Sequence, residues 1–312
     1  MRRKCDIIPC EIYERGDTVT LKEVARAKIN LYLDVVGRRP DGYHDLVSVM
    51  QSISLADTLT LERLGEEIVL CTAADLPCDE HNLAFRAAKA FFAALGQAFG
   101  VRITLEKRIP IQAGLGGGSA DAAAVLRGLN RLAGAPFDTE RLCEIAAGIG
   151  ADVPFCVVGG TRLCRGVGER MEPVKNIRDP FVVVAMAGEG VSTPWAFAEL
   201  DERFGDFAAC ATASVEQVPK LLQALAGADG QLSEELLFNR FEGVIEPQRP
   251  MISHIKSTMS DCGAYCARMS GSGPAVFGLF ENELAACNAQ KALCTMGARA
   301  FVCRFENEKA GE

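Results

Sequence analysis

Residues 109–121 read IPIQAGLGGGSAD: a short apolar segment, four closely spaced glycines, a serine and the start of an alanine-rich segment. Glycine adopts positive φ without steric cost and lets the backbone approach a ligand closely. A helix that begins directly after the glycines offers unpaired N–H groups and the positive end of its dipole to an anion. The stretch therefore predicts a phosphate-binding loop. A plain turn packed against a helix is the alternative for any isolated glycine run.

The segment after the glycines predicts a helix, because its apolar residues recur at helical spacing and Gly134 follows as a stop signal. These apolar residues are Ala122, Val125, Leu126, Leu129 and Leu132. The loop differs from the two commonest glycine loops. A Walker loop requires Gly-Lys-Ser/Thr, and a dinucleotide fingerprint requires a third glycine at the position where Ser119 stands.

The composition is that of an ordinary globular protein, since 49% of the 312 residues are hydrophobic and 24% are charged. A net charge of −8 argues against broad nucleic-acid binding, which needs a basic face. No apolar run approaches the roughly eighteen residues of a membrane span. The thirteen cysteines are odd in number and lie among apolar neighbours, which indicates reduced, buried thiols. We therefore expect a cytoplasmic protein whose partner is a small molecule, not nucleic acid or a membrane.

The order of the expected elements favours an α+β fold over a doubly wound parallel sheet, because strands and helices do not alternate regularly. The expected strands are two within 18–37, two around a turn within 44–64, and one each at 101–109, 181–188, 266–270, 275–280 and 298–305. The further expected helices are 82–99, 139–148, two near 215–226 and 252–259, and one between the last two strands. The segment 173–180 interrupts the pattern and indicates a domain boundary.

Two polar residues, Lys28 and Asn30, lie in an extended segment that leads into a tight turn. They alternate with apolar neighbours, so both side chains should point to one face of a strand. A lone lysine on a strand is usually solvated, and this is the alternative to a role in binding. The motif that follows, PDGYH, forces a tight turn through Pro-Asp-Gly and places Tyr43 beside His44.

Two further motifs contain residues suited to binding or catalysis. In MSGSGP, Gly271, Ser272 and Gly273 form a second permissive loop that leads into a strand. Two glycine loops in one chain suggest a shared polyanionic ligand, although each alone could be an independent turn. In GADVPF, Asp152 is either a helix cap or a carboxylate base, since an unperturbed aspartate is ionised at neutral pH and can accept a hydroxyl proton.

Taken in order, AKIN, PDGYH, GLGGGSADAA, GADVPF and MSGSGP resemble the GHMP kinase superfamily over roughly residues 24–305. The combination of AKIN with GRRPDGYH is similar to the branch that phosphorylates a cytidine diphosphate derivative of methylerythritol in the non-mevalonate isoprenoid pathway. The resemblance implies a two-domain α+β fold, with a left-handed β-α-β crossover in the N-terminal domain and a ferredoxin-like C-terminal domain. The expected division is an N-terminal extension at 1–17, an ATP-binding domain at 18–175 and a C-terminal domain at 176–312.

The resemblance also implies which residues form the site. Lys28 and Asp152 match the family's catalytic lysine and aspartate. The residues that match its ATP-phosphate loop are Pro110, Ile111, Gln112, Ala113, Gly114, Leu115, Gly116, Gly117, Gly118, Ser119 and Ala120. The residues implied in substrate binding are Asn30, Tyr43, His44, Phe197, Gly271, Ser272 and Gly273.

ATP and Mg²⁺ are the implied cofactors, and transfer of the γ-phosphate to the 2-hydroxyl of the methylerythritol moiety is the implied reaction. No dedicated protein ligand is expected for the metal, with Ser119 as the one candidate contact. The expected state is a monomer or a weak homodimer. Two departures from the family pattern are Arg26, where proline is more frequent, and Ala120, where a second serine is frequent. A mevalonate-type GHMP kinase and a non-catalytic nucleotide-binding regulator of the same fold are the alternatives.

Overall fold

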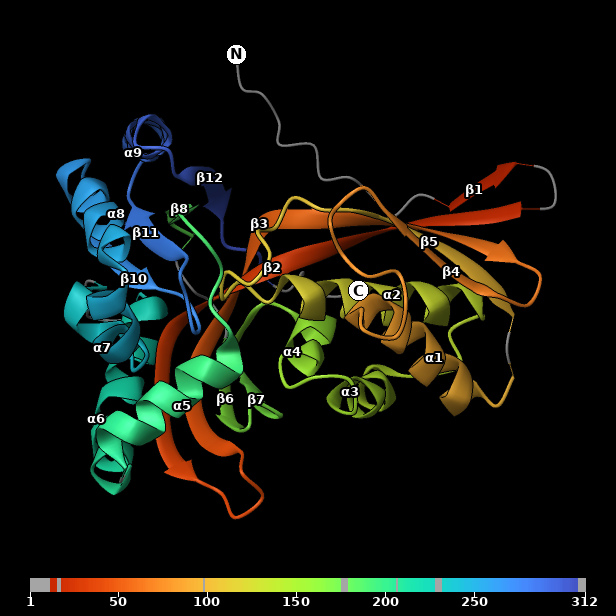
Figure 1. Cartoon of the computed structure of the whole chain (residues 1–312), viewed down its shortest axis with the longest axis horizontal. Coiled ribbons are helices and arrows are strands. Elements are labelled where there is room, and N and C mark those ends of the chain that lie inside the picture. The colour runs from red at the N-terminus through yellow and green to blue at the C-terminus, as the bar shows by residue number, and fades with distance from the viewer. Residues whose placement is uncertain are drawn as a thin grey trace. The chain divides into compact units, whose positions relative to one another are not determined.

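The computed structural model describes residues 12–15, 18–97, 99–174, 179–205, 207–227 and 232–307. The chain divides into two compact units, each assembled from separate segments. Unit 1 comprises 1–25, 56–108 and 118–157, and unit 2 comprises 26–55, 109–117 and 158–312. The long strands β2 (Thr18–Arg38) and β3 (His44–Leu64) contribute residues to both units (Figure 1). The division into contiguous domains at residue 175 stays a prediction.

Unit 1 is built on a mixed sheet with helices packed against it. Its strands lie in the order β1 (Ile12–Arg15), β2, β3, β5 (Gly100–Glu106) and β4 (Ile68–Thr72). Strands β3 and β5 are antiparallel, whereas β4 and β5 are parallel. The helices are α1 (Leu83–Leu95), α2 (Gly117–Leu132), α3 (Thr139–Ala147) and α4 (Val153–Val158). Figure 1 shows α1, α2 and α3 together on one side of this sheet.

Local sequence signals explain where α1 begins and ends. Helix α1 begins at Asn82, whose side chain accepts a hydrogen bond from the Ala84 amide, and ends at Gly96 with φ of 73°. It therefore stops short of residue 99, where the sequence predicted its end. The predicted apolar face of α2 is confirmed at Ala122, Val125, Leu126 and Leu129, which are buried, whereas the fifth predicted member, Leu132, is half-buried at the end of the helix. At Gly128 a Cβ would lie 3.0 Å from the Leu61 side chain, so a small residue allows close contact between helix and sheet.

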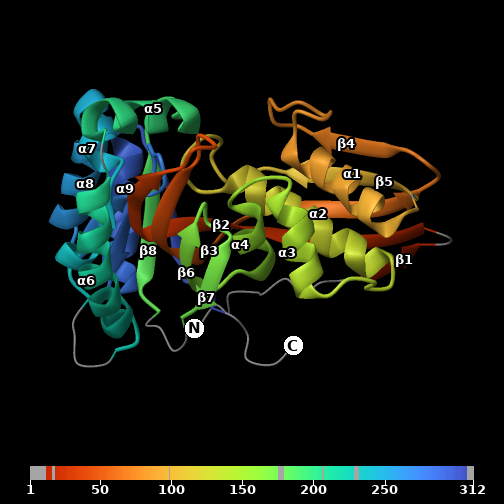
Figure 2. The same cartoon turned by 90° about the horizontal axis from the view of Figure 1, so that it is seen from below.

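Unit 2 contains a four-stranded antiparallel sheet in the order β10 (Cys266–Met269), β11 (Val276–Phe280), β8 (Phe181–Met186) and β12 (Arg299–Arg304). Helices α8 (Pro250–Asp261) and α9 (Glu283–Thr295) pack against this sheet (Figure 2). Along the chain these elements run β8-α8-β10-β11-α9-β12, with further helices between β8 and α8. This is the ferredoxin-like arrangement, so the expected C-terminal architecture is confirmed.

Unit 2 also contains short strands that extend the sheet of β2 and β3, and further helices. Strand β6 (Thr161–Gly166) pairs antiparallel with β3 and with β7 (Arg170–Pro173), and β9 (Phe238–Asn239) pairs parallel with β2. The other helices are α5 (Thr193–Phe204), α6 (Ala208–Leu225), α7 (Glu242–Ile245) and the 3₁₀ turns η1 (Glu234–Leu236) and η2 (Glu246–Gln248). Within the described residues, no helix is both long and apolar enough to cross a membrane.

Strands β2 and β3 correct the sequence prediction. Residues 18–37 and 44–64 were each expected to form two strands, but each segment is part of one continuous strand of 21 residues. In β3 the six consecutive residues from Ser48 to Ile53 are all buried. Only after Ile53 do buried residues alternate with more exposed ones, as expected for a strand with one covered face. The loss of alternation resembles a break in the sequence pattern. The alternation is lost because this stretch of β3 is covered on both faces of the sheet. The strand itself is continuous, since no glycine or proline interrupts it.

Unit 1 contains a buried cluster of three charged residues: Asp57 on β3, Lys107 after β5 and Asp121 on α2. Lys107 Nζ donates to Asp57 Oδ2 at 2.5 Å and to Asp121 Oδ2 at 2.7 Å. Burial raises the pKa of Asp121 to about 8, helped by the negative charge of Asp57 and opposed by Lys107. Burial alone would lower the pKa of Lys107, but the two carboxylates outweigh it and the pKa is raised. Near neutral pH, Asp121 is therefore largely protonated.

We expect Asp121→Asn to raise the thermal stability of the protein in a pH-dependent way. The folded wild type binds a proton at Asp121 that the unfolded chain has lost, so its stability falls as pH rises from about 4 to about 8. Asparagine mimics the protonated carboxyl and removes this dependence. Calorimetry should show a Tm gain of roughly 2–6 °C near pH 8, shrinking toward zero near pH 4. Asp75→Asn, at an exposed site, should show no such trend; a Tm gain that is constant with pH would contradict the account.

Candidate active site

Several residues of the glycine-rich loop have positive φ, a backbone conformation that favours glycine. Gly114 and Gly116 have φ of 79° and 66°, and Gln112 has φ of 52°. Three backbone hydrogen bonds fix the loop within unit 2: Val191 N to Gln112 O at 3.1 Å, Ala275 N to Ala113 O at 3.1 Å, and Lys28 N to Leu115 O at 3.0 Å. Pro110, Ala113 and Leu115 are buried and anchor the loop, whereas Ile111 and Gln112 are exposed.

Helix α2 begins at Gly117, directly after this loop, as the sequence predicted. Ser119 is half-buried in its first turn and Ala120 is buried. A helix that starts here offers its unpaired amides and its positive dipole end to an anion, which is the arrangement expected for a phosphate-binding loop.

The second glycine loop contacts the first, within unit 2. Ser270 Oγ donates to the carbonyl oxygen of Gly114 at 3.0 Å and accepts from the Asn30 amide at 3.3 Å. A Cβ on Gly114 would collide with the Ser270 carbonyl oxygen, and a Cβ on Gly271 would lie 2.8 Å from the Gly114 carbonyl oxygen. Only glycine allows the two backbones to approach so closely at these positions. Gly271, Ser272 and Gly273 are themselves buried.

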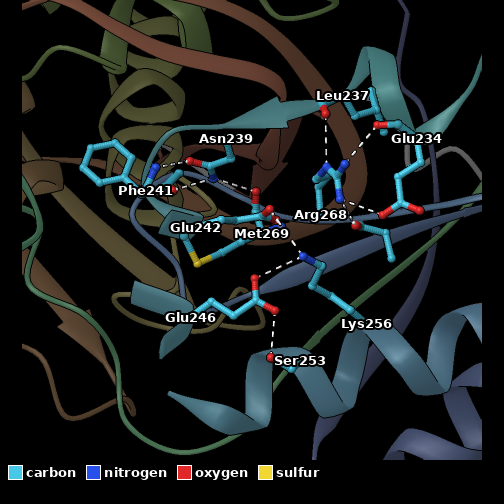
Figure 3. A network of polar contacts seen from close by, with 12 residues as sticks. Glu234, Leu237, Asn239, Phe241, Glu242, Glu246, Ser253, Lys256, Arg268 and Met269 are labelled. Atoms are coloured by element: carbon cyan, nitrogen blue, oxygen red, sulfur yellow. Dashed lines mark hydrogen bonds and ion pairs between the residues drawn. The ribbon is translucent and has the colours of Figure 1, made fainter. Parts of the chain in front are cut away.

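A network of polar contacts that includes Asn239 and Glu242 supports the second loop (Figure 3). Asn239 Nδ2 donates to the carbonyl oxygens of Met269 at 2.7 Å and Gly271 at 2.8 Å. Glu242 Oε1 accepts from the Met269 amide at 2.6 Å, and its Oε2 accepts from Lys256 at 3.3 Å. Sequence reasoning missed Asn239 and Glu242, because nothing local marks residues whose partners lie about thirty positions away along the chain.

Lys28 is buried beside the glycine-rich loop, with only 4% of its surface exposed. Its Nζ donates to Asn30 Oδ1 at 2.8 Å, and Asn30 Nδ2 donates to Ser48 Oγ at 2.9 Å. The Lys28 side chain runs so close to Gly116 that a Cβ there would lie 2.9 Å from its Cγ. The alternative of a solvated lysine is therefore wrong, and Lys28 and Asn30 share one face of β2 as predicted.

The tight turn predicted at Pro-Asp-Gly is present at the β2–β3 hairpin. The Gly42 amide donates to Arg39 O at 3.0 Å, Gly42 has φ of 88°, and the Tyr43 amide donates to Asp41 Oδ1 at 3.1 Å. Tyr43 is 63% exposed. The structure shows no ring contact between Tyr43 and Phe197 in the described part of the chain.

His44 and Phe197 lie together, although 153 positions separate them in the sequence. The two rings stack with centroids 4.6 Å apart and an interplanar angle of 18°. His44 Nε2 lies 2.7 Å from Asp201 Oδ1. Sequence reasoning missed Asp201. Its position four residues after Phe197 puts both side chains on one face of α5, but only the fold brings that face to His44.

Asp152 belongs to unit 1 and precedes α4. Its carbonyl oxygen accepts from the Cys156 amide at 3.1 Å, which places the residue at the N-terminus of this helix, and its side chain is half-buried. This position suits a helix cap, and it leaves the role of the carboxylate as a base a prediction. Among the described residues, no group of three or more His, Cys, Asp or Glu side chains could hold a metal ion.

Comparison with known proteins identifies the class. The family model for the GHMP kinases N terminal domain matches residues 82–160, and that for the GHMP kinases C terminal domain matches residues 200–299. The chain therefore belongs to the GHMP kinase family, a family of small-molecule kinases, and its α+β fold with N- and C-terminal domains is that of the family. Kinases of this kind use ATP.

Within the family, the chain is similar over most of its length to particular curated relatives and to a solved structure. The chain is 44% identical to the 4-diphosphocytidyl-2-C-methyl-D-erythritol kinase of Synechococcus elongatus, over 86% of this chain and 88% of the relative. It is 41% identical to the enzyme of that name from Acaryochloris marina, over 92% and 96%. A crystal structure of 4-(cytidine 5'-diphospho)-2C-methyl-D-erythritol kinase matches with 37% identity and a TM-score of 0.76, covering 92% of this chain and 100% of that one. A homoserine kinase from Cytophaga hutchinsonii, at 21% identity and a TM-score of 0.72, covering 95% and 98%, shares the fold.

Proposed function

We propose that this kinase transfers the γ-phosphate of ATP to the 2-hydroxyl of 4-diphosphocytidyl-2-C-methyl-D-erythritol, in the non-mevalonate route to isoprenoid precursors. The observation that carries the proposal is the identity of 41–44% to curated relatives of this name over most of both chains. The alternatives, a mevalonate-type kinase or a non-catalytic regulator, have no comparable support. We also propose a cytoplasmic location and a monomer or weak homodimer.

The glycine loop would hold the phosphates of ATP. Its positive-φ backbone and the N-terminus of α2 offer amide donors, and phosphoryl transfer depends mainly on positioning and on neutralising charge. Contact between Ser270 and Gly114 extends this support to the second glycine loop, so Gly271, Ser272 and Gly273 belong to the proposed site. The buried stem of Lys28 would direct its ammonium group at the reacting phosphate or hydroxyl, where it stabilises negative charge.

Asp152 is proposed as the group that accepts or orients the proton of the attacking hydroxyl. A half-buried carboxylate at the start of a short helix can accept a hydrogen bond from an alcohol, and general-base assistance is worth about a hundredfold or more in rate. The resemblance in GADVPF supports this role, as does the half-buried position of the side chain.

Magnesium is proposed to arrive with the nucleotide. In kinases, Mg²⁺ typically keeps several waters and is held by substrate phosphates and one or two protein oxygens. The Ser119 hydroxyl, in the first turn of α2, is an oxygen donor that fits this chemistry. When bound, Mg²⁺ would neutralise charge on the β- and γ-phosphate oxygens.

The β2–β3 hairpin and α5 are proposed to recognise cytosine. Tyr43 presents an exposed ring that could stack on a base, and the half-buried Phe197, which stacks on His44 and contacts Phe241 edge-on, is the second aromatic residue proposed for this subsite. Stacking contributes about 1–3 kcal/mol per base and tolerates any base. Discrimination for cytosine therefore depends on hydrogen bonds, for which His44 is the candidate.

The proposal is tested by comparing phosphate acceptors. Purified protein with ATP–Mg²⁺ is assayed for ADP release with four acceptors: the cytidylylated substrate, methylerythritol phosphate without cytidylate, mevalonate and homoserine. We expect efficient turnover of the cytidylylated substrate alone. Comparable turnover of methylerythritol phosphate would show that the enzyme does not depend on recognition of cytosine. Preference for mevalonate or homoserine, or no turnover of any acceptor, would remove the proposed function.

A further inference from the structure

The contact between His44 and Asp201 determines which ring nitrogen of the histidine carries a proton. A carboxylate can only accept hydrogen bonds, and Asp201 Oδ1 lies 2.7 Å from His44 Nε2. The hydrogen must therefore be on Nε2. In the neutral imidazole the other nitrogen, Nδ1, then has a free lone pair and acts as an acceptor. No described residue donates a hydrogen bond to Nδ1.

The surroundings of His44 prevent the ring from turning to another arrangement. Phe197 stacks on one face, and Phe207 contacts the ring edge-on with centroids 5.8 Å apart. His44 is only 8% exposed. Asp201 is itself oriented by Arg38, whose guanidinium lies 3.4 Å from its other carboxylate oxygen. A ring packed on two sides and hydrogen-bonded through one nitrogen presents the other nitrogen in a fixed direction.

A hydrogen-bond acceptor with a fixed direction, such as His44 Nδ1, can distinguish cytosine from uracil. Cytosine has an amino group at C4, which is a donor, whereas uracil has a carbonyl oxygen there, which is an acceptor. An Nδ1 lone pair attracts the amino group and repels the carbonyl. Sites that read a base by a buried hydrogen bond discriminate strongly, because the wrong base leaves their polar atoms unpaired.

We propose that Asp201 is a specificity-determining positioning residue, which holds the hydrogen of His44 on Nε2 so that Nδ1 selects the amino group of cytosine over the carbonyl of uracil. The inference rests on the proposed function, because it assumes that His44 faces the base of a pyrimidine nucleotide substrate. Asp201 acts through His44 and needs no contact with the substrate.

The test compares Asp201→Asn with the wild type on two substrates, the cytidylylated compound and its uridylylated analogue. An asparagine amide can donate as well as accept, so it permits the hydrogen to move to His44 Nδ1. The wild type should prefer cytosine by at least about a hundredfold in kcat/KM. In Asp201→Asn this preference should fall at least about tenfold, through a higher KM for the cytidylylated substrate, with the KM for ATP unchanged.

A matched control and a second readout separate this role from a structural one. Glu202→Gln removes the same charge from the adjacent, exposed position of α5 and should keep the wild-type preference. Long-range ¹⁵N NMR of the imidazole, assigned with His44→Gln, should show the Nε2–H form in the wild type and a mixed or reversed form in Asp201→Asn.

The outcomes distinguish the inference from the proposed function. An active wild type with an unchanged cytosine preference in Asp201→Asn would overturn the inference alone, and so would an Nε2–H form retained in that variant. A wild type that turns over neither pyrimidine substrate would overturn the proposed function and this inference with it.

Discussion

Asp152→Asn should lower kcat by about a hundredfold or more while the KM for ATP stays near its wild-type value. Asparagine has nearly the shape of aspartate and can still cap α4, but it cannot accept a proton or carry the negative charge. The loss should therefore appear in the chemical step, which single-turnover kinetics under saturating ATP can measure. This substitution separates the two interpretations of GADVPF, a base and a helix cap.

The matched control is Asp138→Asn at the start of α3. Asp138 is a demonstrated helix cap, since its side chain accepts from the Arg141 amide. Its substitution should leave kcat within about twofold, because surface caps affect mainly stability. Should Asp152→Asn behave like Asp138→Asn, with a small change in Tm and near-normal turnover, Asp152 is only a cap and the base lies elsewhere.

Lys28→Met should lower kcat by about a hundredfold to a thousandfold, the usual effect of removing a preorganised charge that stabilises a transition state. Methionine keeps the apolar stem that packs against Gly116, and it removes the ammonium group, including its hydrogen bond to Asn30. The fold should therefore survive, as circular dichroism and the melting transition can show. Steady-state kinetics then measure the loss.

Lys22→Met provides the control for charge on the same strand. Lys22 lies on β2 and is exposed, so its removal should change kcat little. Equal losses in the two variants would mean that overall charge, and not the position of Lys28, supports the reaction. A near wild-type kcat in Lys28→Met would show that Lys28 has no catalytic role.

The sequence predicted the features that depend on neighbouring residues. The glycine loop, the start of α2 and the Pro-Asp-Gly turn all rest on the φ freedom of glycine or the fixed φ of proline, which are local properties. Strands β8, β10, β11 and β12 follow from short apolar runs bounded by turn residues. Such signals do not require knowledge of the fold.

The features that the sequence did not predict depend on contacts between distant segments. Because part of β3 is buried on both faces, its sequence lacks regular alternation there, and one continuous strand was predicted as two. Asp201 pairs with a histidine 157 residues away, and Asn239 supports a loop about thirty residues away. Neither residue type nor spacing identifies such partners before the fold is known. Lys28 was marked by its place on a strand, but only the structure shows that it is buried beside the glycine-rich loop.

The most direct test of the central claim is the position of the transferred phosphate. In 4-diphosphocytidyl-2-C-methyl-D-erythritol, C2 carries a methyl group and no hydrogen, so a phosphate on the 2-hydroxyl has no three-bond coupling to a proton. Proton-coupled ³¹P NMR of the product formed with ATP–Mg²⁺ should therefore show one new phosphate monoester signal as a singlet, together with ADP in equal amount. A new signal split by proton coupling would place the phosphate on another hydroxyl, and ADP without a new monoester would mean hydrolysis; either result would contradict the account.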